Sequence, residues 1–107
     1  MSTVRAKFRV DRIEYSMGAK TKLDGEGKPM KNERGYVESV PCKMATIHLL
    51  PVYANGDPNH ENTKFWQSSP SGKIELGCVN AEATKAFNIG QEFYIDFTPA
   101  TEPPVIE

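Results

Sequence analysis

The two histidines are the residues of this 107-residue chain that could act as general bases near neutral pH. His48 lies between Ile47 and Leu49 in an alternating segment, and His60 lies beside Glu61 in a polar turn. Neither has a candidate nucleophile close by, and the sequence has no Gly-rich phosphate loop, no H-E-x-x-H and no G-x-S-x-G motif. The sequence therefore predicts a protein that is not an enzyme and uses no cofactor.

Metal and disulfide chemistry have weak support in the sequence. Asp57, Asn59 and Glu61 alternate like oxygen ligands, but the glycine and flanking helices of a calcium-binding EF-hand are missing. We therefore expect a polar surface turn and no metal site. Cys42 and Cys78 do not form a C-x-x-C pair, which predicts two buried thiols, with a disulfide between neighbouring strands as the alternative.

Aromatic and basic residues in strand-like segments are the candidates for binding. Neighbouring residues of a strand point to opposite faces, so Phe65 and Trp66 cannot both be buried by one face. Basic residues alternate near the N-terminus, where they could line a groove for single-stranded nucleic acid or form a solvated strand face, the interpretation we favour. The candidate binding residues are Trp66, Tyr94, Tyr53, Arg5, Lys7, Arg9 and Arg12.

The charge distribution argues against a general nucleic-acid-binding protein. The net charge is −1, with nine Lys/Arg and five Asp/Glu in residues 1–34 (+4) and four and nine in residues 35–107 (−5). A basic footprint over the whole chain is therefore missing, although a local basic surface remains possible near the N-terminus.

Strand patterns dominate the chain. Residues 4–10 alternate between apolar and basic, and the phase then slips near Asp11-Arg12, as a β-bulge would cause. Residues 36–53 form a second strand region, with a second slip near Met44-Ala45 and Pro41 marking an edge. Further strands are expected at 65–66, 73–79 and 93–97, with a short helix at 81–87 capped by Asn80.

These elements predict a mainly β fold, a small five- to six-stranded barrel or OB-like sheet with one short helix before the last strand. Residues 1–98 would form a single domain that includes a flexible loop at 17–35, followed by an extended Pro-rich tail at 99–107. The sequence predicts no internal repeats. It also has no apolar run long enough for a membrane span or a signal peptide, which predicts a soluble protein that is not secreted.

Several short segments resemble a family of small, largely uncharacterised proteins of tailed bacteriophages. They are Leu50-Pro51-Val52-Tyr53, Phe65-Trp66, Ser69-Pro70-Ser71-Gly72-Lys73-Ile74-Glu75-Leu76, and Phe87, Gly90 and the run Phe93-Tyr94-Ile95-Asp96-Phe97-Thr98-Pro99-Ala100. The resemblance implies a viral setting, in the virion or the host cytoplasm, and assigns no functional residue.

We therefore expect a non-enzymatic phage-encoded binding protein, and specifically a virion accessory protein for capsid decoration or assembly. Its partner would be a viral or host protein surface, and an exposed aromatic residue makes a homo-oligomer plausible. One alternative is a single-stranded nucleic-acid-binding OB-like protein. Another is an anti-defence protein that sequesters a small ligand or a host protein.

Overall fold

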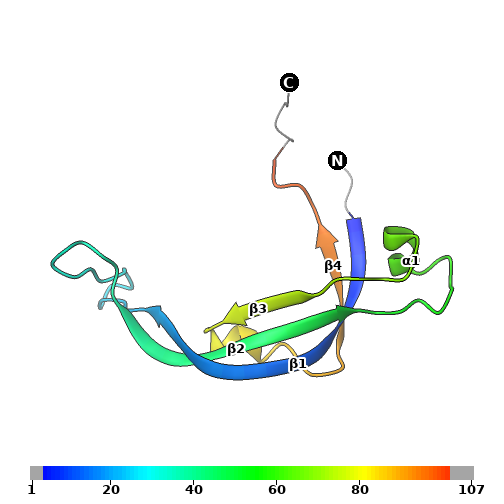
Figure 1. Ribbon diagram of the computed structural model, residues 1–107. Helices are drawn as coiled ribbons and strands as arrows, with labels where there is room; N and C mark the ends of the chain where they lie inside the picture. Colours follow the sequence, from blue (N-terminus) through cyan, green and yellow to red (C-terminus); the bar gives the residue numbers. More distant parts are fainter. Residues whose placement is uncertain (1–3, 102–107) are drawn as a thin grey trace.

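The computed structural model describes residues 4–101, which form one antiparallel β-sheet and two short helices (Figure 1). The strands are β1 (Val4–Thr21), β2 (Ser39–Pro51), β3 (Ile74–Cys78) and β4 (Glu92–Phe97), in the spatial order β3-β2-β1-β4. Helix α1 (Glu61–Trp66) lies between β2 and β3 in the chain, and α2 (Ala81–Thr84) lies between β3 and β4. The mainly β prediction is confirmed, and a short helix precedes the last strand, although it ends at Thr84 and not at residue 87, and the structure has two helices where one was predicted.

The predicted strand number and closure are wrong for the described residues, since the sheet has four strands and stays open, with β3 and β4 as its outer strands. One predicted strand is absent because residues 61–66, expected as a turn followed by a strand at Phe65-Trp66, form helix α1. His60 caps this helix by accepting a hydrogen bond from the Asn62 N–H at Nδ1, and Gln67 ends it in the left-handed conformation. Local capping therefore outweighed the strand preference of two adjacent aromatic residues.

The first predicted bulge is confirmed, because the β1–β2 register shifts between Val10 and Arg12. The second is wrong: the pairing runs without a shift from Arg12 opposite His48 to Thr21 opposite Ser39. The apolar residues change faces along β2 because the covered face changes. Ala45, Ile47 and Leu49 are buried on one face, whereas Val40, Cys42 and Met44 are half-buried on the other.

The core lies on one face of the sheet, where all four strands meet. Its buried side chains come from β1 and β2, and α1 and the segment after α2 contribute half-buried aromatics. The buried members are Ala6, Phe8, Val10, Ile47 and Leu49, and the half-buried side chains packed on them are Ile13, Trp66, Ile74, Phe87, Phe93 and Ile95. We call the part of the molecule built around this core, residues 4–15 and 45–101, the body.

Beyond the body, β1 and β2 continue as a two-stranded arm, drawn at the left of Figure 1. Its stem pairs residues 16–21 of β1 with residues 39–44 of β2, past the last β2–β3 pair at Ala45 and Cys78. Its tip is residues 22–38. Much of the predicted 17–35 loop is therefore strand or hairpin. The radius of gyration, 18.9 Å, far exceeds the roughly 13 Å of a compact domain of this length.

The tip contains an eight-residue repeat that the sequence analysis did not find. Residues 22–29 and 30–37 each form a small hairpin, closed by the bridges Leu23–Pro29 and Lys31–Val37. In the first hairpin the Asp24 carboxylate accepts hydrogen bonds from two backbone N–H groups, and the Asn32 side chain does the same in the second. The repeat was hard to see because only turn residues recur.

Three backbone segments meet where the two hairpins join the stem. The Met30 N–H donates to the Lys22 carbonyl, the Lys22 N–H to the Glu38 carbonyl, and the Glu38 N–H to the Met30 carbonyl. This closed ring of hydrogen bonds gives the tip a defined shape without a hydrophobic core.

Candidate binding surfaces

The predicted basic face exists, and acidic residues of β4 accompany it. Arg5, Lys7 and Arg9 share a face of β1, and their partners across the β1–β4 ladder are Asp96, Tyr94 and Glu92 respectively. The Arg5 guanidinium contacts Asp96 at 2.7 Å through Nε and forms a second bond through Nη2. Arg9 bonds Glu92 at 2.7 Å, and the Lys7 ammonium lies 3.8 Å from the same carboxylate. Most of the positive charge on this face is therefore balanced locally.

These contacts are reflected in the ionisation of the acids. The Arg5 side chain, by hydrogen bonding first and by its charge second, lowers the pKa of Asp96. The hydrogen bond from Arg9 lowers the pKa of Glu92 in the same way. Tyr94 completes the row: Arg5 and Lys7 lie 4.9 and 5.1 Å from its ring centroid, and its side chain remains half exposed.

Of the pair Phe65 and Trp66, the candidate binding residue Trp66 is the less exposed one. It is half-buried, its ring centroid lies 6.1 Å from that of Phe8, and its Nε1–H donates to the Ser71 carbonyl at 3.1 Å. Phe65 packs edge-on against Trp66 and is the more exposed of the two, at 43%. In a helix, unlike a strand, adjacent residues are about 100° apart, so the alternation argument did not apply here.

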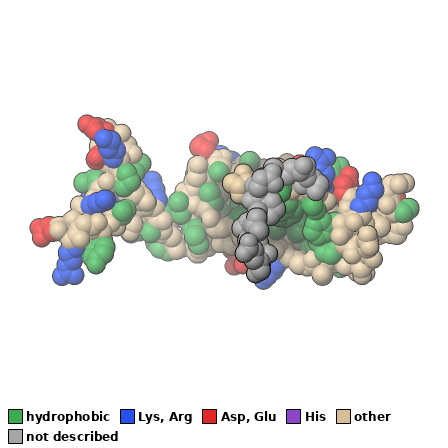
Figure 2. All heavy atoms as spheres, turned by 90° about the horizontal axis from the view of Figure 1, so that it is seen from above, with side chains coloured by type: hydrophobic (Ala, Val, Ile, Leu, Met, Phe, Trp, Pro, Cys, Tyr) green, Lys and Arg blue, Asp and Glu red, His purple; other side chains and the backbone are tan. Residues whose placement is uncertain are grey.

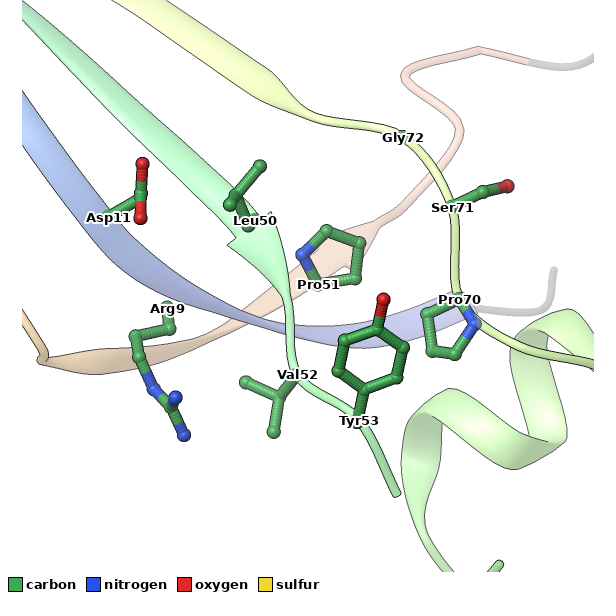
Figure 3. Close-up of a pocket in the computed structure, with 9 residues that line it drawn as sticks. All are labelled: Arg9, Asp11, Leu50, Pro51, Val52, Tyr53, Pro70, Ser71 and Gly72. Carbon is green, nitrogen blue, oxygen red and sulfur yellow. The ribbon is translucent and has the colours of Figure 1, made fainter. Parts of the chain in front are cut away.

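Tyr53 and Arg9 lie in one hollow of about 370 Å³, which lies within the usual size range of ligand pockets. Figure 3 shows the rings of Tyr53, Pro51 and Pro70 toward one end and Arg9 and Asp11 toward the other. The hollow is formed by β1, the end of β2 and the segment that leads into β3. Sequence reasoning missed it because Pro70 and Tyr53 come together only in the folded chain.

Arg12 lies apart from the other basic candidates, past the bulge, in a row of charges across three strands. It bonds Glu14 at 3.2 Å, and Glu14 contacts His48 Nε2 at 2.5 Å. His48 Nδ1 is 3.5 Å from Glu75, which Lys73 holds at 2.9 Å. Each of the two carboxylates next to His48 therefore also contacts a basic side chain, Arg12 in the case of Glu14 and Lys73 in the case of Glu75. The row links β1, β2 and β3.

The two histidines have different surroundings. His60 Nδ1 accepts the hydrogen bond that caps α1, whereas His48 lies between the carboxylates of Glu14 and Glu75. Within residues 4–101, no group of three or more His, Cys, Asp or Glu side chains could hold a metal ion. Cys42 and Cys78 are free and half-buried, less deeply buried than predicted. Among the described residues, no helix is long and apolar enough to cross a membrane.

The arm carries the exposed apolar side chains that are hardest to explain in isolation. They stand on the stem, on the tip and, in the case of Tyr15, just before the stem, and Figure 2 shows apolar and charged side chains together at that end of the molecule. The exposed fractions are 61% for Tyr15, 79% for Met17, 55% for Leu23, 67% for Tyr36 and 53% for Val37. Much of this region was predicted to be a flexible loop at 17–35, because its many charged residues leave no apolar periodicity.

No protein-family model, curated protein or solved structure matches this chain. The fold and its surfaces therefore define only a structural class: a small open-sheet β protein with a projecting hairpin arm.

Proposed function

We propose that this chain is a non-enzymatic binding protein of a tailed bacteriophage, a virion accessory protein whose arm tip docks onto a neighbouring protein subunit. The phage setting rests on the resemblance of its 50–53, 65–66, 69–76 and 93–100 segments, together with Phe87 and Gly90, to small phage proteins. The mode of action rests on the arm.

The exposed apolar surface of the tip is the observation that carries the proposal. Leu23, Tyr36 and Val37 are each more than half exposed, and they are attached to a ribbon that receives no support from the core. Exposed apolar surface on a projecting element is disfavoured in water, so it is typical of a segment that becomes covered on assembly. The hydrogen-bonded ring at residues 22, 30 and 38 favours the same conclusion, because a preformed tip loses less entropy on docking.

The chemistry of the tip also describes its partner. Four basic and four acidic residues surround the apolar side chains, so the tip has no net charge. Two pairs lie within ion-pair distance of each other, Lys22 with Glu38 at 3.6 Å and Lys28 with Glu26 at 3.7 Å. The matching surface is therefore an apolar patch with a polar rim of both signs, as on a protein subunit, and not the uniform charge of a nucleic acid.

The test is quantitative mass spectrometry of purified phage particles carrying either the natural chain or the double variant Tyr36→Ser, Val37→Ser. We expect the natural chain in the particles and about a tenfold loss of the variant, since central aromatic contacts dominate such interfaces. Ile89→Ser is the matched control, because Ile89 is an equally exposed apolar residue on the body, at 68%. Absence of the natural chain from particles, or equal loss of both variants, contradicts the proposal.

A second candidate, single-stranded nucleic-acid binding, has one specific observation in its favour. Tyr94 is half exposed and flanked by Arg5 and Lys7, an arrangement that could stack a base beside a phosphate. The ion pairs with Asp96 and Glu92 count against it, because they neutralise the cations that would bind phosphates. Binding of a labelled oligothymidine at low salt, lost in Tyr94→Ala, would support it, and no binding at low salt would end it.

A further inference from the structure

The outer backbone edge of β1 is free along the arm. β4 pairs with β1 only from Val4 to Arg9, and the last backbone bonds on that side join Val10 to Gly90 and Gln91. From Ile13 to Thr21, β1 has β2 on one side and no ladder partner on the other among the described residues 4–101. About nine residues of strand edge are therefore open to another strand.

The other open edges of the sheet carry the usual protection against edge-to-edge pairing. The free part of β2 contains Pro41, which cannot donate to a ladder. β3 and β4 have only five and six residues, and their outer edges include the charged residues Glu75, Glu92 and Asp96. In contrast, residues 15–19 of β1 (Tyr-Ser-Met-Gly-Ala) contain neither a charge nor a proline. Within the free edge, this central stretch between Glu14 and Lys20 lacks the charge and the proline that protect the other edges, which indicates a partner strand.

We infer that the free β1 edge binds the same edge of a second copy of this chain, antiparallel and centred on Met17. In this register Glu14, which also contacts Arg12 and His48 of its own chain, stands opposite Lys20 of the other copy, and the two-fold symmetry creates that pair twice. Glu14 and Lys20 are the only charged residues within residues 13–21, and the register centred on Met17 is the one that places them opposite each other. The charges of this segment therefore favour pairing with a second copy in that register.

The same register accounts for the exposed apolar residues of the stem. Tyr15, Met17 and Ala19 alternate on one face of β1. Pairing brings Met17, which is 79% exposed, against Met17 of the other copy. It also brings Tyr15, which lies just before the stem and is 61% exposed, against Ala19 of the other copy. The dimer uses the stem and leaves the tip free, so it does not depend on the proposed docking of the tip.

Charge reversal tests the inference on the full-length protein by sedimentation equilibrium. The natural chain should be a concentration-dependent dimer. Lys20→Glu should raise the dimer dissociation constant about tenfold, because two opposite-charge pairs become like-charge pairs, and Glu14→Lys should do the same. The double variant Glu14→Lys, Lys20→Glu restores both pairs and should recover the natural constant within about threefold.

Lys64→Glu is the matched control, since it makes the same charge change on exposed α1 of the body. A chain that is monomeric at all concentrations would overturn the inference. So would equal effects of Lys20→Glu and Lys64→Glu, or a double variant as weak as the single ones.

Cysteine crosslinking tests the register separately. In a Cys42→Ser, Cys78→Ser background, Met17→Cys should form a symmetric disulfide dimer under mild oxidation, because directly opposed residues lie about 4.5–5.5 Å apart between Cα atoms. Lys20→Cys should not, since the two copies of residue 20 would be offset by roughly 20 Å along the strands. Crosslinking of Lys20→Cys as efficient as that of Met17→Cys would overturn the Met17-centred register.

Discussion

The body and the arm are built from the same two strands, yet they are stabilised in different ways. In the body, β1 and β2 have β4 and β3 as outer neighbours, and one face is covered by side chains from α1 and the segment after α2. In the arm the two strands have only each other, and every strongly apolar residue is at least partly exposed. The backbone ladder is continuous across the boundary. Strand pairing therefore extends well beyond the region in which burial stabilises it.

This difference assigns separate roles to the two regions. A two-stranded ribbon is at best marginally stable in water, so the arm depends on turn chemistry and, when assembled, on partners. Among residues 4–101, the body holds the fully buried polar residue Asn62 as well as the buried apolar side chains, and it provides a fixed base for the arm. Variants that act on one region and spare the other can test this division.

Truncation of the body core should have the largest effect. Leu49→Ala removes a side chain that is 1% exposed, and we expect a loss of about 2–4 kcal/mol in the free energy of unfolding from lost burial and a cavity. Leu23→Ala makes the same change in the arm, at a residue that is 55% exposed, and should cost less than about 0.5 kcal/mol. Urea denaturation measures both. Similar losses would show that the arm is part of the cooperative core.

Loss of the buried polar clamp should come next. Asn62 is completely buried and bonds the Lys7 N–H, the Lys7 carbonyl and the Val52 carbonyl, at 2.6, 2.8 and 2.6 Å. It thus joins β1 to the segment just past the end of β2, where the Val52 N–H also donates to the Lys7 carbonyl. Asn62→Ala leaves the Lys7 N–H and the Val52 carbonyl without the bonds that Asn62 makes, and should cost about 2–3 kcal/mol by the same measurement. Asn59→Ala, at an exposed position of the preceding turn, is the control and should be near neutral.

Asn62 also shows where sequence reasoning stops. In the sequence it is one more polar residue after a turn, and its partner Lys7 lies 55 positions away. The features that could be predicted were local: the alternation of β1, its bulge, and the Asn80 cap of α2. Helix α1 was missed because its His60 cap and Gln67 end involve residue types that rarely mark helix ends.

For the basic face of β1, too, only the local features could be predicted from the sequence. Alternation alone predicted that Arg5, Lys7 and Arg9 share a face, and they do. Their pairing with Asp96 and Glu92 could not be predicted, because the register between the first and last strands depends on the whole fold. The exposed apolar residues of the arm were in plain view in the sequence, but exposure depends on neighbours that the sequence does not specify.

A smaller effect is expected from the turn glycines of the tip. Gly27 and Gly35 have φ values of 80° and 82°, a conformation that costs other residues about 1 kcal/mol. Gly27→Ala, Gly35→Ala should therefore speed hydrogen exchange at the Lys28 and Tyr36 amides several-fold. The midpoint of global unfolding should be unchanged, because the body does not depend on the tip.

Gly25→Ala is the control for that experiment, because Gly25 does not have a positive φ and an added Cβ would meet open space. It should leave the exchange rates near those of the natural chain. If the double variant also lowers the midpoint of global unfolding, the tip and the body unfold as one unit, and the arm is not independent of the body.

The smallest effect is expected for the decline of stability at acid pH, which should depend on ion pairs of the body. The pKa values of Asp96 and Glu92 are lowered in the folded chain by hydrogen bonds from Arg5 and Arg9. A lowered folded-state pKa stabilises the native state above the ordinary carboxyl pKa of about 4, and this contribution is lost as the pH falls through the lowered folded value. Exposure of these pairs keeps the contribution modest.

Asp96→Asn, Glu92→Gln should therefore flatten the decline of stability between about pH 4.5 and pH 2, measured by urea denaturation at each pH. Glu26→Gln is the matched arm variant, since Glu26 pairs with Lys28 within the tip, which the body does not need in order to fold. It should leave the acid limb of the natural chain unchanged. If Glu26→Gln flattens this limb as much as the body variant does, the arm contributes to global stability through its charges, and its independence of the body is refuted.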